Sequence, residues 1–407
     1  MTESESKLKI TAASLQPELW TCSSNEAVNI FVTYPDGKAV NFHPTFTYPI
    51  FGDSEQIFGY QDLTIFLCFD HYTFYPFLNV KFAEKLEDNT IEDPKEEMLK
   101  FLPQSTVFKD ESEWLDEISK EKQHYKIPGE LVGEEFVHKD STYAIYKINL
   151  RDTTGLELHQ RLQILSLLFI EAASYIDYQD ELWELYVLYR MDKDQENTIV
   201  GFCTAYNYWK YNGHQKFDEG ILETRKKISQ FIVLPPYSGQ LLGGTFYTKL
   251  FETWLAIPEI VEIVVEDPNE SFDDLRDRCD LSRLATSVIL VDDPNLPIFD
   301  SKWTEDLRIQ QKLEKRQFSR LLEMLLLYRY QHHLSLVPKN QIRQFIKRRL
   351  YAKNKDVLES LDKPTFMDKL QTAYDSLEQD YMRILEPLKL RKRGIDSNSS
   401  SSKRAKK

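Results

Sequence analysis

The chain has 407 residues, enough for two or three domains that each bury a core. Apolar residues make up 42% and aromatic residues 13%, a composition that excludes an intrinsically disordered protein. The formal net charge of −14 disfavours direct nucleic acid binding by the folded body and favours basic partners, although an acidic surface without a partner stays open.

Cysteine usage and hydropathy indicate the compartment. The four cysteines lie far apart and form no C-x-x-C pair, which argues against a zinc site and a disulfide framework. No run approaches the roughly 18 apolar residues of a membrane span, and the N-terminus has no signal-peptide core. His332 and His333 lack further ligands at suitable spacing, so no metal is expected. We predict an intracellular, soluble protein that contacts no membrane.

The first part of the chain predicts a flexible N-terminus at residues 1–18 and a β-rich domain at residues 19–128. Short apolar stretches between residues 20 and 82 alternate with Asp-Gly, Pro and Gly-Asp turns, a pattern typical of strands. Helices are expected at residues 92–102 and 111–121.

Residues 129–293 predict the core domain. Residues 125–132, which contain Pro-Gly, are expected to form a linker before it. Residues 160–177 are apolar on nearly every face and predict a buried helix that contains Glu171. Three strands, a helix at residues 245–255 and a closing strand follow. This order predicts an α/β (α+β) fold with a central mixed sheet.

The last part predicts a helical region at residues 294–388 and a basic tail at residues 389–407. Apolar residues recur at helical spacing in the former. The tail holds eight Lys and Arg residues against Asp396, with a Ser-rich spacer, and is not expected to fold alone.

Residues 264–271 read V-V-E-D-P-N-E-S, an apolar strand that stops at two carboxylates. Asp-Pro and Asn are ordinary turn formers, so a solvated turn is one interpretation. The other is catalytic, because an apolar environment raises the pKa of a carboxyl group until it can act as a general base.

Four long words resemble the type B histone acetyltransferase catalytic subunits, a family of the Gcn-five-related N-acetyltransferase superfamily, and most of all its fungal members. They are F-T-Y-P-I-F-G-D-S-E-Q-I-F-G-Y at 46–60, S-L-L-F-I-E-A-A-S-Y-I-D at 166–177, V-V-E-D-P-N-E-S-F-D-D-L-R-D-R at 264–278 and R-Q-F-S-R-L-L-E-M-L-L-L at 316–327. The resemblance covers residues 17–330 in the family's order.

The resemblance implies an N-acetyltransferase fold and transfer of acetyl from acetyl-CoA to lysines of newly made, free histone four, with histone two-A as an additional substrate. It implies histone three and a WD-repeat histone-binding chaperone as partners, a role in chromatin assembly and DNA repair, and location in cytoplasm and nucleus.

The reaction needs a proton acceptor, because a free lysine with a pKa near about 10.4 is almost fully protonated at neutral pH. Glu266 is the first candidate as general base, Glu171 on the predicted buried helix is the second, and Asp267 is the third. The resemblance maps its catalytic carboxylates onto these positions. A buried Glu171 held by backbone N–H groups or an arginine is the structural alternative.

The pyrophosphate of the coenzyme is expected at a helix N-terminus that follows a glycine-containing loop. The superfamily pattern Gln/Arg-x-x-Gly-x-Gly/Ala falls on this loop, but Ser238 replaces its first residue and Leu241 its first glycine. A Cβ-bearing Leu241 meets difficulty at φ > 0. The resemblance implies these coenzyme-binding residues: Phe231, Ile232, Val233, Ser238, Gly239, Gln240, Leu241, Leu242, Gly243, Gly244, Asn269, Phe272 and Arg278. The alternating charges at residues 273–278 also fit a run of surface ion pairs.

The histone tail is expected in a groove that carries acids and an aromatic side chain. The resemblance implies that Asp53, Ser54, Glu55 and Trp209 line it, with Asp218 and Glu219 adding negative charge nearby. Residues 212–220 match the family surface that contacts the chaperone. As isolated features these are a turn and a half-exposed aromatic ring.

The basic clusters at residues 389–393 and 403–407 resemble a two-part nuclear import signal. A loose contact with acidic surfaces is the alternative for the same charges.

Two other functions stay open. Ser238 and Leu241 motivate a histone-binding assembly factor on the same fold with impaired catalysis. A small-molecule or amino-terminal acetyltransferase fits the superfamily but not the long words.

Overall fold

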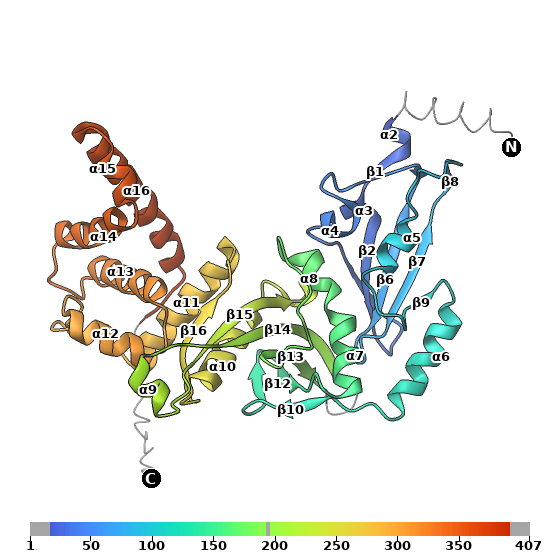
Figure 1. The fold of residues 1–407 in the computed structure, drawn as a ribbon, viewed down its shortest axis with the longest axis horizontal. Helices are drawn as coiled ribbons and strands as arrows, with labels where there is room; N and C mark the ends of the chain where they lie inside the picture. The colour runs from blue at the N-terminus through green and yellow to red at the C-terminus, as the bar shows by residue number, and fades with distance from the viewer. Residues whose placement is uncertain (1–16, 193–195, 391–407) are drawn as a thin grey trace, which may run out of the picture. The chain divides into compact units, whose positions relative to one another are not determined.

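The computed structural model describes residues 17–192 and 196–390, which divide into two compact units at Phe246 and Tyr247. Unit 1 mixes strands and helices, and the described part of unit 2 is helical apart from one strand. The α/β (α+β) prediction is therefore confirmed (Figure 1). The predicted domain borders at 128/129 and 293/294 stay predictions. Residues 1–16 of the predicted flexible N-terminus and residues 391–407 of the predicted basic tail fall outside the described residues, while residues 17–18 lie in a short helix.

The N-terminal part of unit 1 is β-rich, as predicted. Its five-stranded sheet has the order β3-β2-β6-β7-β9 and is mixed, with β2 parallel to β6 and β7 parallel to β9. The elements are α2 (Pro17–Trp20), β1 (Thr21–Ser23), α3 (Ser24–Ala27), β2 (Val28–Thr33), β3 (Ala39–Phe42), α4 (Tyr48–Phe51), β4 (Gln56–Phe58), β5 (Tyr60–Gln61), β6 (Thr64–Asp70), β7 (Pro76–Lys81), β8 (Glu84–Lys85), α5 (Pro94–Leu99), β9 (Val107–Phe108) and α6 (Glu111–Lys122).

The two predicted helices of this part are confirmed, and each begins where an aspartate accepts a hydrogen bond from the first turn. Asp93 accepts from the Lys95 amide at 3.0 Å, and Asp110 accepts from the Glu113 amide at 3.0 Å. A side-chain acceptor at this position satisfies a backbone donor that the helix leaves unpaired.

The rest of unit 1 is built on an antiparallel sheet with the order β10-β12-β13-β14-β15, to which β11 adds by pairing with β12. Its elements are β10 (Gly129–Leu131), β11 (Phe136–His138), β12 (Ser141–Ile148), α7 (Thr153–Leu162), α8 (Ile164–Phe169), β13 (Trp183–Met191), β14 (Thr198–Trp209), α9 (His214–Asp218), β15 (Thr224–Val233), η1 (Pro235–Tyr237) and α10 (Leu242–Leu255). The linker predicted at 125–132 is therefore partly wrong, because β10 joins the sheet edge.

The long helix predicted at residues 160–177 is also wrong over its second half. Helix α8 ends at Phe169, and Ile170 is already extended at φ −119° and ψ 122°. The Leu168 carbonyl accepts hydrogen bonds from the amides of Thr45 and Phe46, and Ala172, at φ 56°, donates its amide to the Tyr48 hydroxyl. These tertiary contacts replace the helical hydrogen bonds of the next turn, which an apolar pattern alone does not reveal.

In residues 247–390, unit 2 is helical after one strand, and its helices are confirmed in the region predicted for them. Its elements are the later part of α10, β16 (Ile260–Val265), α11 (Glu270–Ser287), α12 (Ser301–Gln310), α13 (Lys315–Gln331), α14 (Lys339–Lys353), α15 (Lys355–Glu359) and α16 (Lys363–Leu385). Among the described residues, no helix has both the length and the apolarity that crossing a bilayer requires.

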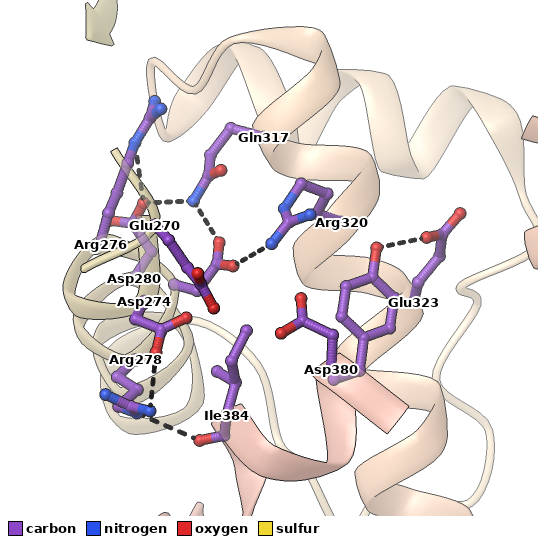
Figure 2. Close-up of polar contacts among 12 residues, drawn as sticks. Glu270, Asp274, Arg276, Arg278, Asp280, Gln317, Arg320, Glu323, Asp380 and Ile384 are labelled. Carbon is purple, nitrogen blue, oxygen red and sulfur yellow. Dashed lines mark hydrogen bonds and ion pairs between the residues drawn. The ribbon is translucent and has the colours of Figure 1, made fainter. Parts of the chain in front are cut away.

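A buried polar network joins α11, α13 and α16 in unit 2. Asp277, fully buried, accepts hydrogen bonds from Gln317 at 2.9 Å and Arg320 at 2.6 Å, and Figure 2 shows the latter two side chains turned toward α11. Glu323, also fully buried, accepts from Arg349 at 2.7 Å and the Tyr381 hydroxyl at 2.7 Å. The interpretation of residues 273–278 as a run of surface ion pairs is thus wrong for Asp277, because the helices bury this residue.

Glu184 on β13 is a partly buried carboxylate of the core sheet, with its side chain 14% exposed. It accepts hydrogen bonds from Lys147 on β12 at 2.7 Å, from the Tyr186 hydroxyl at 2.6 Å, and from Lys226 on β15. Burial opposes its ionised form, but the Lys226 and Lys147 ammonium groups outweigh burial and lower the pKa of Glu184 to about 2. The pair between strands β13 and β15 spans β14 and so ties three strands together.

We expect Glu184→Gln to lower the free energy of unfolding by about 3 kcal/mol at pH 7. The reason is that folding lowers the pKa of the Glu184 carboxyl group from about 4.3 to about 2. A depressed pKa gives stability that is fully present above the unfolded value and is lost as the pH falls toward 2. The difference between wild type and variant should therefore shrink between about pH 5 and pH 3 in urea unfolding.

The matched control is Glu130→Gln, which changes an exposed glutamate on strand β10 of the same sheet. Its difference from wild type should be small and independent of pH. A Glu184→Gln difference that stays constant from pH 7 to pH 3 would contradict the ionic account.

Candidate coenzyme and catalytic site

The loop before α10 has the form that a phosphate site requires. It runs from η1 through Ser238 and Gly239, which has φ 70°, to Leu241, and α10 then begins at Leu242. The Thr245 amide donates to the Leu241 carbonyl at 3.2 Å, which closes the first turn. The loop 238–245 contains no charged side chain, so any attraction for an anion comes from backbone N–H groups and the helix dipole.

Leu241 adopts the backbone conformation that its place in the pattern calls for. Its φ is 65°, in the left-handed region, and its side chain is 82% exposed. A Cβ-bearing residue pays roughly 1–2 kcal/mol for this conformation, which glycine adopts freely. The departure at this position therefore strains the loop, and the leucine side chain is exposed to solvent.

Side chains from three places hold the loop in this shape. The Ser238 hydroxyl donates to the Val233 carbonyl at 3.4 Å, and the Gln240 amide group donates to the Pro236 carbonyl at 3.3 Å. His138, from β11, contacts the Gln240 carbonyl through Nε2 at 2.8 Å and the Thr245 hydroxyl through Nδ1 at 3.1 Å. The sequence did not suggest His138, because 102 residues separate it from Gln240.

The segment Phe231, Ile232 and Val233 forms the end of β15 and pairs with residues 201–203 of β14. Gly201 lies opposite, where a Cβ would meet the Ile232 carbonyl oxygen at 2.3 Å, so the close approach requires glycine. The register between β14 and β15 shifts at Thr204 and Ala205. Bulges of this kind re-aim backbone groups and occur next to active sites.

Glu266 and Asp267 follow directly after β16, as the sequence predicts. Both side chains are exposed, and Asp267 has φ 33°. Glu171 lies in a turn after α8 and is exposed as well. The burial expected of these carboxylates is thus wrong, because β16 and α8 both end before them.

The three residues expected near the coenzyme on α11 have structural partners. Asn269 is the N-cap and accepts from the Phe272 amide at 2.9 Å. The Phe272 ring meets Tyr247 edge to face at 6.0 Å between centroids. Arg278 donates to Asp274 at 3.2 Å and to the Ile384 carbonyl of α16 at 3.3 Å, contacts that Figure 2 shows. These contacts fix the first turns of α11.

The residues expected to line the tail groove differ in exposure and in the hydrogen bonds that their side chains form. Asp53 and Ser54 are exposed in the turn after α4. Glu55 accepts hydrogen bonds from the Thr47 amide at 2.6 Å, the Tyr48 amide at 3.2 Å and Asn25 at 2.9 Å, and these bonds lower its pKa. Glu55 therefore shapes the loop that presents Asp53 and Ser54.

Trp209 belongs to an exposed aromatic cluster with Tyr211 and Phe217. The three rings lie 5.6–6.4 Å apart, and they are 48%, 59% and 56% exposed. Asp218 ends α9 and Glu219 follows it, both exposed. Exposed apolar patches rimmed by polar groups typically mark interaction surfaces.

Among the described residues, we looked at two other kinds of site: an activated cysteine thiol and a metal centre. Burial raises the pKa of Cys279 to about 11, and burial likewise raises that of Cys203, so neither thiol is an activated nucleophile. No group of three or more His, Cys, Asp or Glu in residues 17–192 and 196–390 has the arrangement of a metal site.

Two family models match the chain: "Histone acetyl transferase HAT1 N-terminus" at residues 20–171 and "Fungal HAT1, C-terminal" at residues 277–331. Proteins named "Histone acetyltransferase type B catalytic subunit" are similar over nearly the full length. The one from Debaryomyces hansenii is 62% identical over 100% of this chain and 99% of its own, and the one from Candida albicans is 58% identical over 96% and 95%. The one from Kluyveromyces lactis is 46% identical over 97% and 100%. The chain belongs to the family of type B histone acetyltransferase catalytic subunits.

Proposed function

We propose that the chain transfers the acetyl group of acetyl-CoA to lysine side chains in the N-terminal tail of free, newly synthesised histone four, in support of chromatin assembly. The observation that carries the proposal is the 62% identity, over 100% of the chain, to a relative named as a catalytic subunit of this type. The loop and first turn of α10 support it from the geometry, because a glycine-containing loop that leads into a helix N-terminus suits an anion even without a charged side chain.

The donor binds with its pyrophosphate at the first turn of α10. Gly239 and the left-handed Leu241 shape the loop there, and the amides of Gly243 and Gly244 lie in that turn. The pantetheine arm pairs with the main chain of Phe231, Ile232 and Val233, whose N–H groups supply a donor for the oxyanion of the tetrahedral intermediate.

Glu266 takes the proton from the substrate ammonium group. The neutral amine nitrogen attacks the thioester carbon and the C–S bond breaks. The attacking nitrogen loses its second proton as the amide forms, and that proton neutralises the leaving thiolate, so the coenzyme departs as its thiol. Bound peptide and coenzyme exclude water from a carboxylate that is exposed without them, which makes the carboxylate a better base. Glu171 and Asp267 assist through a water or by holding the ammonium group.

The acidic surface favours a lysine-rich tail over a neutral peptide. Asp53, Asp218 and Glu219 are exposed, and the body outside the basic tail carries a large negative charge. Such a field raises the association rate of a basic tail and weakens as salt is added.

Glu266→Gln should lower kcat by roughly 10² to 10⁴ with the fold intact, because general-base catalysis is lost without change in shape. The measurement is transfer of labelled acetyl from acetyl-CoA to a histone-four tail peptide. A peptide with its lysines replaced by glutamines is the blank and should receive no label.

The control variant is Glu259→Gln, which changes an exposed carboxylate at the opposite end of β16 and should keep near-normal kcat. A Glu266→Gln rate near wild type across pH would remove the assignment of the base. Label on the lysine-free peptide would indicate an amino-terminal acetyltransferase. Saturable histone binding by wild type without coenzyme binding would favour the assembly factor that Ser238 and Leu241 motivate.

Trp209 is proposed to line the groove of the histone tail. The adjoining surface of residues 211–220, which carries the exposed rings of Tyr211 and Phe217, is proposed to dock a WD-repeat histone-binding chaperone. Ile221 and Leu222 extend it, at 45% and 67% exposure. Together they leave an apolar surface next to Asp218 and Glu219, and aromatic side chains of this kind dominate the energy of many interfaces.

Phe217→Ala should weaken binding of the purified chaperone by about 2 kcal/mol, or roughly 30-fold, while kcat on a short tail peptide stays unchanged. Surface plasmon resonance measures the affinity. Val137→Ala removes a different exposed apolar side chain of unit 1, 72% exposed, and should have no effect. Equal affinities of wild type and Phe217→Ala would place the chaperone elsewhere.

The basic tail at 389–407 is proposed to direct nuclear import, so that the protein occupies cytoplasm and nucleus. Deletion of residues 391–407, which leaves the described residues intact, should reduce nuclear accumulation in cell imaging without loss of peptide acetylation. Unchanged nuclear accumulation would count against the signal.

A further inference from the structure

His138 bridges both ends of the strained coenzyme loop. Its Nε2 lies 2.8 Å from the Gln240 carbonyl oxygen, on one side of Leu241, and its Nδ1 lies 3.1 Å from the Thr245 hydroxyl, on the other. The two contacts fix the residue before Leu241 and the first turn of α10 after it. They come from β11, a strand outside the loop and the helix.

The geometry points to His138 as a positioning residue that holds loop 238–245 in the conformation that receives the pyrophosphate of acetyl-CoA, an inference that rests on the proposed function. A left-handed leucine persists only where its surroundings fix it. Where the superfamily pattern has a glycine, this chain carries Leu241, and the His138 bridge offsets the cost of that substitution.

The hydrogen bonds of the bridge are satisfied in either protonation state of the imidazole. A carbonyl oxygen only accepts, so Nε2 carries a hydrogen and donates to Gln240. In the neutral ring Nδ1 is an acceptor, and the Thr245 hydroxyl donates to it. In the charged ring Nδ1 donates to that hydroxyl, whose own hydrogen then serves the Leu241 carbonyl at 3.3 Å.

Contacts within its own hairpin also hold the His138 ring in place. His138 is the last residue of β11 and pairs with Ser141 across a turn at Lys139 and Asp140, where Lys139 has φ 53°. The ring also lies edge-on to Tyr143, at 6.3 Å between centroids. A side chain fixed by its own hairpin loses little further entropy when it bonds to the loop, so its hydrogen bonds stabilise the loop efficiently.

The test is His138→Phe, which keeps a planar ring beside Tyr143 and removes both hydrogen bonds. We expect the Kd for acetyl-CoA, measured by calorimetry, and the KM for acetyl-CoA to rise about tenfold, because the loss of one or two hydrogen bonds weakens the loop conformation by about that factor. We expect kcat at saturating acetyl-CoA and the KM for the tail peptide to stay within about twofold. His138→Gln, which keeps one N–H donor, should give an intermediate Kd.

A double-mutant cycle with Thr245→Val separates the bridge from a general weakening of the hairpin. If the two side chains act together, His138→Phe should raise the Kd less in the Thr245→Val background than in wild type. Val137→Ala, on the same hairpin, is the control and should leave the Kd unchanged. A Kd that His138→Phe leaves unchanged, or additive effects in the cycle, would overturn the inference.

Amide hydrogen exchange in the protein without coenzyme tests the bridge independently of the proposed function. Residues 239–245 should exchange faster in His138→Phe than in wild type, while β13 and β14 exchange alike in both. Equal exchange at residues 239–245 would overturn the bridge even if the enzyme is active. Failure of wild type to bind acetyl-CoA would instead overturn the proposed function.

Discussion

Burial of one face of α10, directly after the exposed Leu241, is the constraint on which the candidate coenzyme site depends. Phe246, Tyr247, Phe251 and Trp254 are at most 1% exposed, so the body of the helix has little freedom to shift. Leu241, one residue before the helix, is 82% exposed. A helix anchored in this way presents its first N–H groups at a fixed place, which is the condition for binding an anion without a charged side chain.

Buried or partly buried carboxylates tie strands together in unit 1 and helices together in unit 2. Glu184 ties β12, β13 and β15 through two lysines, and Asp277 and Glu323 tie α11 to α13 and α13 to α14 and α16. Each accepts hydrogen bonds from several donors, because a buried charge without partners costs several kcal/mol. Burial raises the pKa of Asp277 and of Glu323, whereas the two lysines lower that of Glu184.

The carboxylates proposed for chemistry and tail recognition are exposed by contrast. Glu266, Asp267 and Asp53 lie where a strand or helix has just ended, so solvent reaches them. The family resemblance groups three further residues with them: Glu55, Asn269 and Arg278. The polar atoms of these side chains form hydrogen bonds with backbone groups and neighbouring side chains. Their effect on binding is therefore through the conformation of the loop or helix turn that they fix.

Sequence alone determined the family, the succession of strands and helices, and the position of Glu266 and Asp267 at the end of a strand. Those features follow from local patterns: apolar alternation, Asp caps before α5 and α6, and long words that match the family. Tertiary structure decided where α8 stops, because the amides of Thr45 and Phe46 take the Leu168 carbonyl, and it therefore decided that Glu171 is exposed. It also decided that Asp277 is buried and that His138 meets Gln240 and Thr245. Contacts between residues that are distant in sequence leave no periodic trace along the chain, so only the folded structure reveals them.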